Sequence, residues 1–367
     1  MKPAEPPLPE PAPGSASGRA APAATPSAAG AGFPSSVLAA ALASAVQPLV
    51  GAAPRLAVAV SGGADSAMLA AHAAPLARRL GIDLLIFHVH HGLQAAADDW
   101  AAHVQALGRI LQVSVHTSRA QVRADSGLGI EAAARDARYA ALADLARQHE
   151  AGHILLAHHQ GDQAETVLLR LLRGAGVQGM AAMAPSMPRD GLLYLRPWLN
   201  QGRADILRAA QAFAAQHGWQ PVQDPTNADP RYTRAAVREL LTPVLDARWP
   251  GWQARLADHA RHMADAARIL AEVARADLAA LQPSADLASF ALAPWRELSA
   301  ARQAQVLRYW LHLHGARMPT EARLADLLRQ LRQLHSLGHD RQMRVTHARH
   351  VIRCHRGRVW IEPRGQD

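Results

Sequence analysis

The sequence is poor in cysteine, in aromatic residues and in long apolar runs. Its single cysteine, Cys354, excludes a disulfide framework within one chain and any Cys-x-x-Cys zinc or iron–sulfur site. No run of 18 or more apolar residues occurs, and the N-terminus lacks a basic segment followed by an apolar one. The sequence therefore predicts neither a membrane span nor secretion, and we expect a cytoplasmic protein.

Aromatic residues make up only 4% of the 367 residues, and alanine dominates the hydrophobic fraction of 49%. This composition favours a helix-rich α/β protein with small side chains at its helix contacts.

The formal net charge is +9 at pH 7, and arginine carries nearly all of the positive charge. Between Ala316 and Asp367 the chain has eleven arginines against five acids. Such a basic region indicates a polyanionic partner such as a nucleic acid, because cationic side chains gain affinity by releasing counterions from phosphates. Arginine-rich usage alone can also follow from genomic base composition.

Residues 1–33 consist mainly of Pro, Ala, Gly and Ser, which predicts a disordered tail. A transit peptide is the weaker alternative, since Glu5 and Glu10 stand among very few basic residues.

Strand and helix patterns alternate after a first helix near 35–48. We expect strands at 56–60, 84–89, 113–115 and 153–156, followed by helices ending near 80, 110, 149 and 173. This alternation predicts a parallel, doubly wound sheet with helices on both faces. Polar segments follow Val60, Val89 and Leu156, so one site at the carboxyl edge of the sheet could collect all three.

Beyond Pro197 the pattern is mostly helical. Residues 252–281 have the spacing of a long connecting helix, and the C-terminal region has helical patterns at 297–314 and 319–334. Short strands are expected at 343–345 and 351–361.

Two glycines mark the turn between the first strand and its helix, in the segment Ser61-Gly-Gly-Ala-Asp-Ser66. Backbone N–H groups there could surround phosphate oxygens, with the helix N-terminus adding its positive dipole. The alternative is a plain helix start in which Asp65 or Ser66 is the N-cap. No lysine follows the glycines, which excludes the P-loop of γ-phosphoryl transfer enzymes.

The other polar segments each have a structural alternative. The histidines of 88–91 are typical of a strand end, and a metal site is disfavoured because His91 points away from His88 and His90. Residues 129–139 form an amphipathic helix pattern in which Glu131 and Arg135 are an i,i+4 pair.

Asp162 and Glu165 have the spacing of a capping box with an acidic cap, but together with His158 they could also share a helical face at the edge of the sheet. The segment 223–230 is typical of a turn, and Arg234 and Arg238 could lie on a solvated helix face.

The segment Ser61–Ser66 resembles the Ser-Gly-Gly-x-Asp-Ser PP-loop of ATP pyrophosphatases. Residues 158–179 resemble, at nearly every position, the block His-His-x-Asp-Asp-Gln-x-Glu-Thr…Arg-Gly-x-Gly of the tRNA(Ile)-lysidine synthetase family. Residues 88–94, 131–139 and 223–238 resemble further family segments. Four positions depart from the family pattern: His90, Gln94, Gly161 and Ala235. The likeness is strong over about 55–245 and looser over 295–362, and the last domain of longer members is not expected.

The resemblance implies an adenine nucleotide alpha hydrolase-like fold in which ATP and Mg²⁺ adenylylate the wobble cytidine of tRNA(Ile), after which L-lysine displaces AMP to give lysidine. The implied catalytic residues are Asp65, also the metal ligand, with Arg135, His158, Asp162 and Glu165. The implied nucleotide-binding residues are Ser61, Gly62, Gly63, Ala64, Asp65, Ser66, His88, His91 and Gly92. The residues implied to contact lysine or tRNA are Glu131, Arg138, Arg173, Asp224, Asn227, Arg234 and Arg238.

The same resemblance divides the chain into the tail, an ATP-binding domain at 34–225, a helical linker at 226–290 and a basic tRNA-binding domain at 291–367. A homodimer is possible. Two alternatives remain: another PP-loop tRNA-modifying enzyme such as a thiolase, and a tRNA-binding protein with a decayed ATP site. A thiolase of this type would need a cysteine-rich site, and the intact segment Ser61–Ser66 argues against decay.

Overall fold

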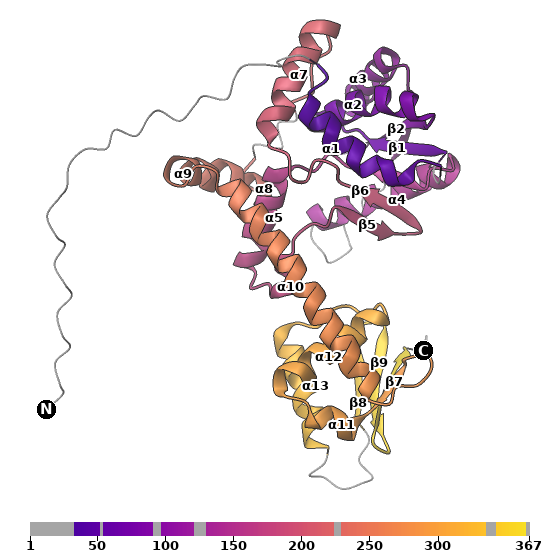
Figure 1. Ribbon diagram of the computed structural model, residues 1–367, viewed down its shortest axis with the longest axis vertical. Helices are drawn as coiled ribbons and strands as arrows, with labels where there is room; N and C mark the ends of the chain where they lie inside the picture. The colour runs from indigo at the N-terminus through magenta and orange to yellow at the C-terminus, as the bar shows by residue number, and fades with distance from the viewer. Residues whose placement is uncertain are drawn as a thin grey trace, which may run out of the picture.

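The computed structural model describes residues 33–51, 54–90, 97–120, 130–223, 229–334 and 343–364, without the side chains of residues 97, 130 and 131. Two units lie at opposite ends of one long helix, α10 (Figure 1). Residues 1–32 of the tail expected to be disordered at 1–33 lie outside the described residues, whereas Phe33 packs edge-on against His72 and Phe213 and so contradicts that expectation at its last position. Within the described part of the chain, no helix is both long and apolar enough to cross a membrane.

The first unit is built around a six-stranded sheet in the order β3-β2-β1-β4-β6-β5. The strands β1 (Arg55–Ala59), β2 (Asp83–His90), β3 (Ser114–Arg119) and β4 (His153–Leu155) are parallel. Helices α2 (Ala64–Leu80), α3 (Ala97–Leu111), α4 (Ile130–Gln148) and α5 (Gln160–Leu172) follow them in turn. The predicted parallel α/β sheet is confirmed.

Both faces of this sheet are buried, because alternate side chains of each strand enter different cores. Leu56 and Val58 of β1 belong to a core that includes residues of α1 (Ser36–Val46), α2 and α7 (Arg203–His217), whereas Ala57 belongs to a core with α4. Trp198 fastens α1 to the first core, since its fully buried indole donates to the carbonyl of Leu38 at 3.0 Å.

A hairpin at the sheet edge was not predicted. Strand β6 (Leu192–Leu195) pairs parallel to β4, and β5 (Ser186–Arg189) pairs antiparallel to β6. Asp190 and Gly191 join them with φ values of 54° and 78°, the backbone of a tight hairpin turn. The sequence signal was this Asp-Gly pair, and the strands themselves are too short to show a clear alternation.

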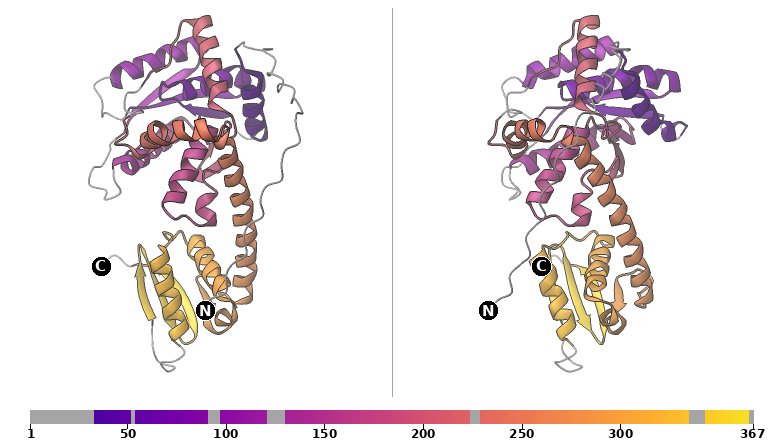
Figure 2. Two further views of the ribbon diagram at one scale, coloured as in Figure 1. Left: turned by 90° about the vertical axis from the view of Figure 1, so that its left-hand side faces the viewer. Right: turned by 60° about the vertical axis from the view of Figure 1, so that its left-hand side comes forward.

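Helix α7 follows the hairpin, and the chain then passes through short helices into the long connecting helix. These are α8 (Thr233–Ala236), the π-helical turn η3 (Val237–Leu241) and α9 (Thr242–Arg248). Helix α10 (Trp252–Ala280) then runs for 29 residues, a length of about 44 Å. Its first half packs on α5 and α6 (Val177–Met180) through Ala260, Val167 and Met180. Figure 2 shows the connecting helix from two sides.

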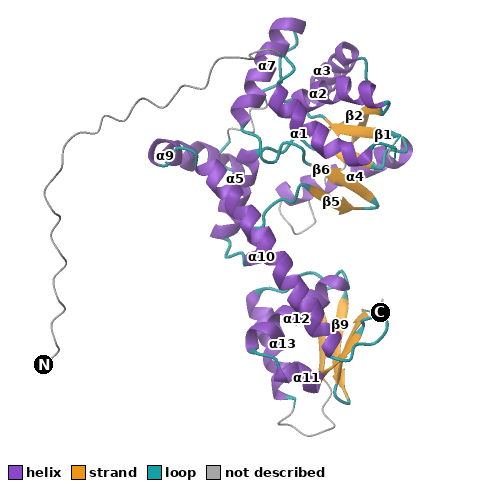
Figure 3. Ribbon diagram, viewed as in Figure 1, coloured by secondary structure: helices purple, strands orange, loops and turns teal. Residues whose placement is uncertain are grey.

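The second unit combines three helices with an antiparallel sheet in the order β7-β10-β9-β8. The strands are β7 (Ser289–Ala291), β8 (Met343–His347), β9 (His350–His355) and β10 (Arg358–Pro363). Helices α11 (Leu292–Glu297), α12 (Ala300–Leu313) and α13 (Glu321–Gln333) cover one face (Figure 3). The single strand expected at 351–361 is a hairpin, because Arg356 and Gly357 turn the chain with positive φ.

The core of the second unit is apolar and includes Trp295, Trp310 and Phe290, all fully buried. Asp277, near the end of α10, forms an ion pair with Arg302 at the start of α12 and so ties the connecting helix to this unit.

We expect Trp310→Ala to lower the free energy of unfolding by about 3–5 kcal/mol, because a fully buried aromatic side chain is lost together with its hydrogen bond to the carbonyl of Leu287. The matched control is Trp360→Ala, which changes a residue of β10 in the same unit that is 41% exposed. Denaturant unfolding would measure both variants. Equal losses in the two would contradict this account of the core.

Candidate active site

A cavity of about 1150 Å³ lies at the carboxyl ends of β1, β2 and β4. Its walls include Val60, Phe87, Val89 and Leu156 at the strand ends, together with Ser61 and residues 63–66 after β1 and residues 157–162 after β4. The chain moves outward from β1 to β2 and β3 and then returns to β4 on the other side of β1. The cavity therefore occupies the switch point where ligands bind in such sheets, as the sequence predicted.

The loop Ser61–Ser66 enters α2 without a side-chain cap. Gly62 has a φ of +96°, which only glycine adopts readily, and Gly63 occupies the N-cap position. The hydroxyl of Ser66 holds the turn, since it accepts from the N–H of Ser61 at 3.1 Å and donates to the carbonyl of Gly63 at 3.2 Å. The alternative that Asp65 or Ser66 caps the helix is thus wrong. The first N–H groups of α2 stay available to an anion.

A segment that sequence reasoning missed closes over this loop. The N–H of Val222 donates to the carbonyl of Gly62 at 2.9 Å, and the Val222 side chain lies where a side chain at position 62 would point. Residues 220–223 all line the cavity. No local pattern marks them, because their role comes from a tertiary contact.

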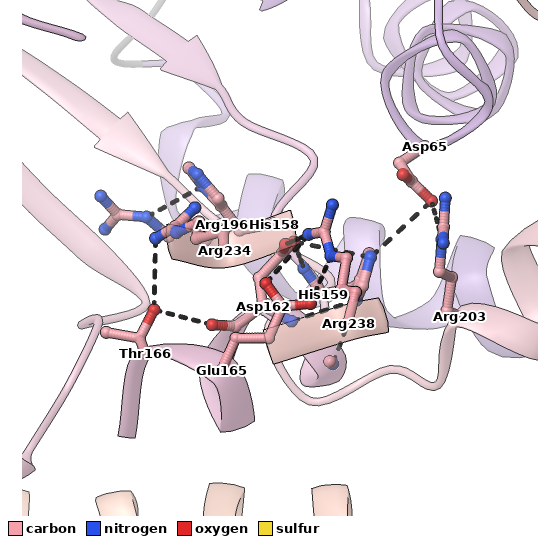
Figure 4. Close-up of polar contacts among 11 residues, drawn as sticks. Asp65, His158, His159, Asp162, Glu165, Thr166, Arg196, Arg203, Arg234 and Arg238 are labelled. Carbon is pink, nitrogen blue, oxygen red and sulfur yellow. Dashed lines mark hydrogen bonds and ion pairs between the residues drawn. The ribbon is translucent and has the colours of Figure 1, made fainter. Parts of the chain in front are cut away.

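Asp65 points from the first turn of α2 into the cavity (Figure 4). Its buried Oδ1 accepts no hydrogen bond from the described residues. The nearest basic side chains are Arg203 at the start of α7, whose Nε lies 3.5 Å away, and His159, whose Nε2 lies 3.9 Å away. This oxygen is therefore suited to bind a cation or a donor group of a ligand.

Helix α5 begins with a capping box in which the cap is a histidine. The side chain of His159 accepts from the N–H groups of Gly161 and Asp162, and the Asp162 carboxylate accepts from the N–H of His159 at 3.0 Å. The prediction of an acidic cap is wrong in this respect: Asp162 is the third residue of the helix, and Glu165 takes no part in the cap. The Asp162 side chain nevertheless faces the cavity.

Arg238 joins the two acids of α5 into one network. Its guanidinium donates to both oxygens of Glu165 at 2.5 and 2.9 Å and to Oδ1 of Asp162 at 3.2 Å. Burial lowers the pKa of Arg238, but the hydrogen bond and charge of Glu165 outweigh burial and raise it. Arg234 donates to Thr166 at 3.4 Å, next to the acids in space. Arg238 is thus not on a solvated helix face.

Burial raises the pKa of the Asp162 carboxyl, but the opposing effects of His159, His158 and Arg238 together hold it below its usual range. The carboxylate form is therefore favoured in the folded protein.

His158 lies in the cavity among arginines. Arg196, which is buried, donates through Nε to Nδ1 of His158 at 3.3 Å. Burial lowers the pKa of His158 to about 3, and the charges of Arg196, Arg138 and Arg135 act in the same direction, whereas Asp162 opposes them. The ring is neutral near pH 7, so it is a weak base but a fixed hydrogen-bonding group.

Some predicted site residues lie away from the cavity. His88 is buried and its Nδ1 donates to the carbonyl of Val60 at 2.8 Å, so it links the ends of β1 and β2. Arg173 is exposed at the end of α5, and Arg135 donates to the hydroxyl of Tyr139 at 3.5 Å. None of the three lines the cavity, whereas Arg138, Tyr139 and Arg234 do.

Five singled-out residues lie outside the described part of the chain, as does the side chain of Glu131. They are His91, Gly92, Gln94, Asp224 and Asn227. Of the other departures from the family pattern, His90 pairs with Asp98 at 3.2 Å, Gly161 lines the cavity, and Ala235 is buried in α8. Sequence reasoning also missed His159, Arg196 and Arg203; His159 stood inside a recognised segment, where its cap position was a usable signal.

Comparisons with known proteins agree with this geometry. A family model of the PP-loop domain matches residues 35–245, and a model of the TilS substrate binding domain matches residues 290–360. The tRNA(Ile)-lysidine synthase of Bordetella pertussis is 66% identical over 321 residues, which cover 88% of this chain and 100% of that protein. The chain belongs to the tRNA(Ile)-lysidine synthase family.

A more distant family member, the tRNA(Ile)-lysidine synthase of Ralstonia nicotianae, is 42% identical and is matched over 86% of this chain and 66% of its own length. The solved structure of the U34-tRNA thiolase NcsA from Methanococcus maripaludis has a TM-score of 0.52, with 12% identity, over 62% of this chain and 78% of that one. This likeness shows the fold alone.

Membership of the lysidine synthase family implies use of ATP through the PP-loop. The alternatives of a thiolase and of a decayed site are not favoured. Cys354 is buried in the core of the second unit, so it supplies no sulfur ligand at the cavity.

We expect His158→Gln to flatten the fall in stability at acid pH. A histidine with a lowered folded pKa binds its proton mainly in the unfolded state, so stability is lost as pH falls below the ordinary pKa of 6.5 toward about 3. The loss from this residue is on the order of 1–2 kcal/mol at pH 5. Denaturant unfolding of wild type and variant at pH 7.5 and pH 5 measures this loss. If the free energy of unfolding falls by the same amount in both proteins between the two pH values, the lowered pKa of His158 is contradicted.

We expect Arg238→Ala to lower the free energy of unfolding by roughly 2 kcal/mol or more, because it leaves two largely buried carboxylates without their counter-ion. The control is Arg261→Ala on α10, which breaks an ion pair with Asp258 whose side chains are both more than half exposed. That control should change stability by less than about 0.5 kcal/mol. Thermal or denaturant unfolding that ranks the two variants equally would rule out a structural role for the network.

Proposed function

We propose that this protein uses ATP to ligate L-lysine to carbon 2 of the wobble cytidine of tRNA(Ile), releasing AMP and pyrophosphate. Family membership supports the reaction, and one observation on the structure carries the assignment of its site. The PP-loop and the acids Asp162 and Glu165 line the same cavity at the switch point, the two acids from the N-terminal part of α5.

The first half of the cavity fits ATP with Mg²⁺. The turn at Gly62 and Gly63 and the uncapped start of α2 present N–H groups to a phosphate. Mg²⁺ is commonly held by one or two carboxylates together with substrate phosphates. Oδ1 of Asp65, which accepts no hydrogen bond from the described residues, fits that role. When bound, the ion would neutralise charge on the departing pyrophosphate. The protein's own part is to orient the phosphates and the carboxylate.

The second half of the cavity fits the amine of lysine. Asp162 and Glu165 present two carboxylates that can bind an ammonium group and take its proton, so that the neutral amine can attack carbon 2 as AMP leaves. Arg238 already pairs with both acids, so an incoming ammonium must share these oxygens or displace the guanidinium. His158, with its pKa lowered to about 3 by burial, is a hydrogen-bonding group in this proposal and not the base.

The tRNA is proposed to contact both units. Arg138, Arg203 and Arg234 line the cavity and can meet phosphates beside the wobble base. The second unit carries six arginines against one acid between residues 343 and 364 and matches the substrate binding domain model. Helix α10, which is about 44 Å long, connects the two regions, and a span of this size suits a macromolecular substrate. The expected homodimer and cytoplasmic location belong to the same proposal.

The test is release of AMP and pyrophosphate from ATP, together with transfer of labelled lysine, using tRNA(Ile) with an unmodified wobble cytidine. We expect Asp65→Ala to abolish nucleotide release and lysine transfer, because the site loses the carboxylate proposed to hold Mg²⁺ beside the phosphates. Asp162→Asn should retain adenylation of the tRNA but lose lysine transfer by 10²-fold or more, as for loss of a general base. The control is Asp258→Asn, an exposed carboxylate on α10.

Tight binding of tRNA without nucleotide turnover by the wild type would refute the proposed reaction. Full lysine transfer by Asp162→Asn would leave the reaction standing and remove Asp162 from it.

A further inference from the structure

Gly161 stands where the resembling family segment has aspartate, and the structure shows what occupies the space. A Cβ atom at position 161 would lie 2.9 Å from Cε1 and 3.1 Å from Nδ1 of His159. These distances are shorter than the contacts that carbon atoms normally make, so any side chain at 161 must displace the ring. The imidazole of His159 therefore depends on the glycine for its place.

The hydrogen bonds of His159 fix its tautomer. Nδ1 accepts from the N–H groups of Gly161 at 3.0 Å and Asp162 at 3.4 Å, so the ring proton is on Nε2. Nε2 lies 3.5 Å from Oδ2 of Asp162 and 3.9 Å from Oδ1 of Asp65. The ring is 4% exposed and thus presents one N–H between the carboxylate of the PP-loop and the carboxylate of α5 (Figure 4).

His159 also holds Asp162 through its backbone. Its N–H donates to Oδ2 of Asp162 at 3.0 Å, so backbone and ring approach the same carboxylate oxygen. The other oxygen, Oδ1, faces Arg238 at 3.2 Å. One residue therefore determines which oxygen of Asp162 is turned toward the region where the amine is proposed to bind.

We propose that His159 is a positioning residue for the lysine step, and that in this chain the lack of a side chain at Gly161 lets the imidazole ring keep its present position. This inference rests on the proposed function. In it, His159 orients Asp162 for the ammonium group and keeps Asp65 at a fixed distance from it. A ring that served only as a helix cap would affect folding but would not distinguish lysine from ATP.

The experiment compares His159→Ala, Gly161→Ala and the double variant with wild type. Lysine KM and kcat are measured by transfer of labelled lysine, and adenylation by tRNA-dependent exchange of labelled pyrophosphate into ATP. We expect each single variant to raise the KM for lysine about tenfold, as for loss of one polar contact to a charged group, with the KM for ATP changed less than twofold. In the double variant, Gly161→Ala should add nothing, since no ring remains to be displaced.

Two further variants separate positioning from folding. His159→Asn keeps a side-chain oxygen that can cap α5, so it should restore the melting temperature but not the KM for lysine. Gly152→Ala is the matched glycine control, because a Cβ atom at that position meets nothing within 4 Å.

Three outcomes would overturn the proposal: an unchanged lysine KM in His159→Ala, a normal KM in His159→Asn, or additive effects of the two alanine substitutions. Absence of lysine transfer by the wild-type protein would instead refute the proposed function, so the two failures are distinguishable.

Discussion

The first turns of α2 and α5, which carry Asp65 and Asp162, lie close together because the chain turns away from β1 in two directions. It builds β2 and β3 on one side and returns to place β4 on the other, which leaves a gap above the carboxyl ends of β1 and β4. Both loops run directly from a strand into a helix, so two helix N-termini point into that gap. The segment at 220–223 and the arginines of α8 and η3 pack around this gap and line the same cavity.

This constraint explains why much of the site could be predicted from the sequence. Strands β1, β2 and β4 contain buried apolar runs such as Leu84–Phe87, as expected of strands buried on both faces, and polar residues follow each of them. A parallel sheet brings those strand ends to one edge, so Ser61–Ser66 and His158–Glu165 could be placed together without coordinates. The chemistry assigned to them came from the family resemblance and not from the spacing.

The remaining parts depend on contacts between distant segments. Arg238 meets Glu165 across 73 positions of sequence, and no local periodicity reports such a pair. Val222 covers Gly62 through one hydrogen bond and one side chain. The edge hairpin of β5 and β6 was missed for a different reason: the strands have four residues each, and only the turn at Asp190 and Gly191 marks them.

The network of Arg238 with Asp162 and Glu165 has two physical requirements that oppose each other. Two poorly exposed carboxylates that share one partner repel one another. Each buried charge without a counter-ion would lower the stability of the fold by several kcal/mol, so a cation is needed between them. The same oxygens are the ones proposed to receive an ammonium group. A guanidinium stabilises these carboxylates by hydrogen bonds and charge. It does not transfer a proton to them at neutral pH, because it keeps its charge. Arg238 therefore helps to keep Asp162 ionised until an amine replaces part of its contacts.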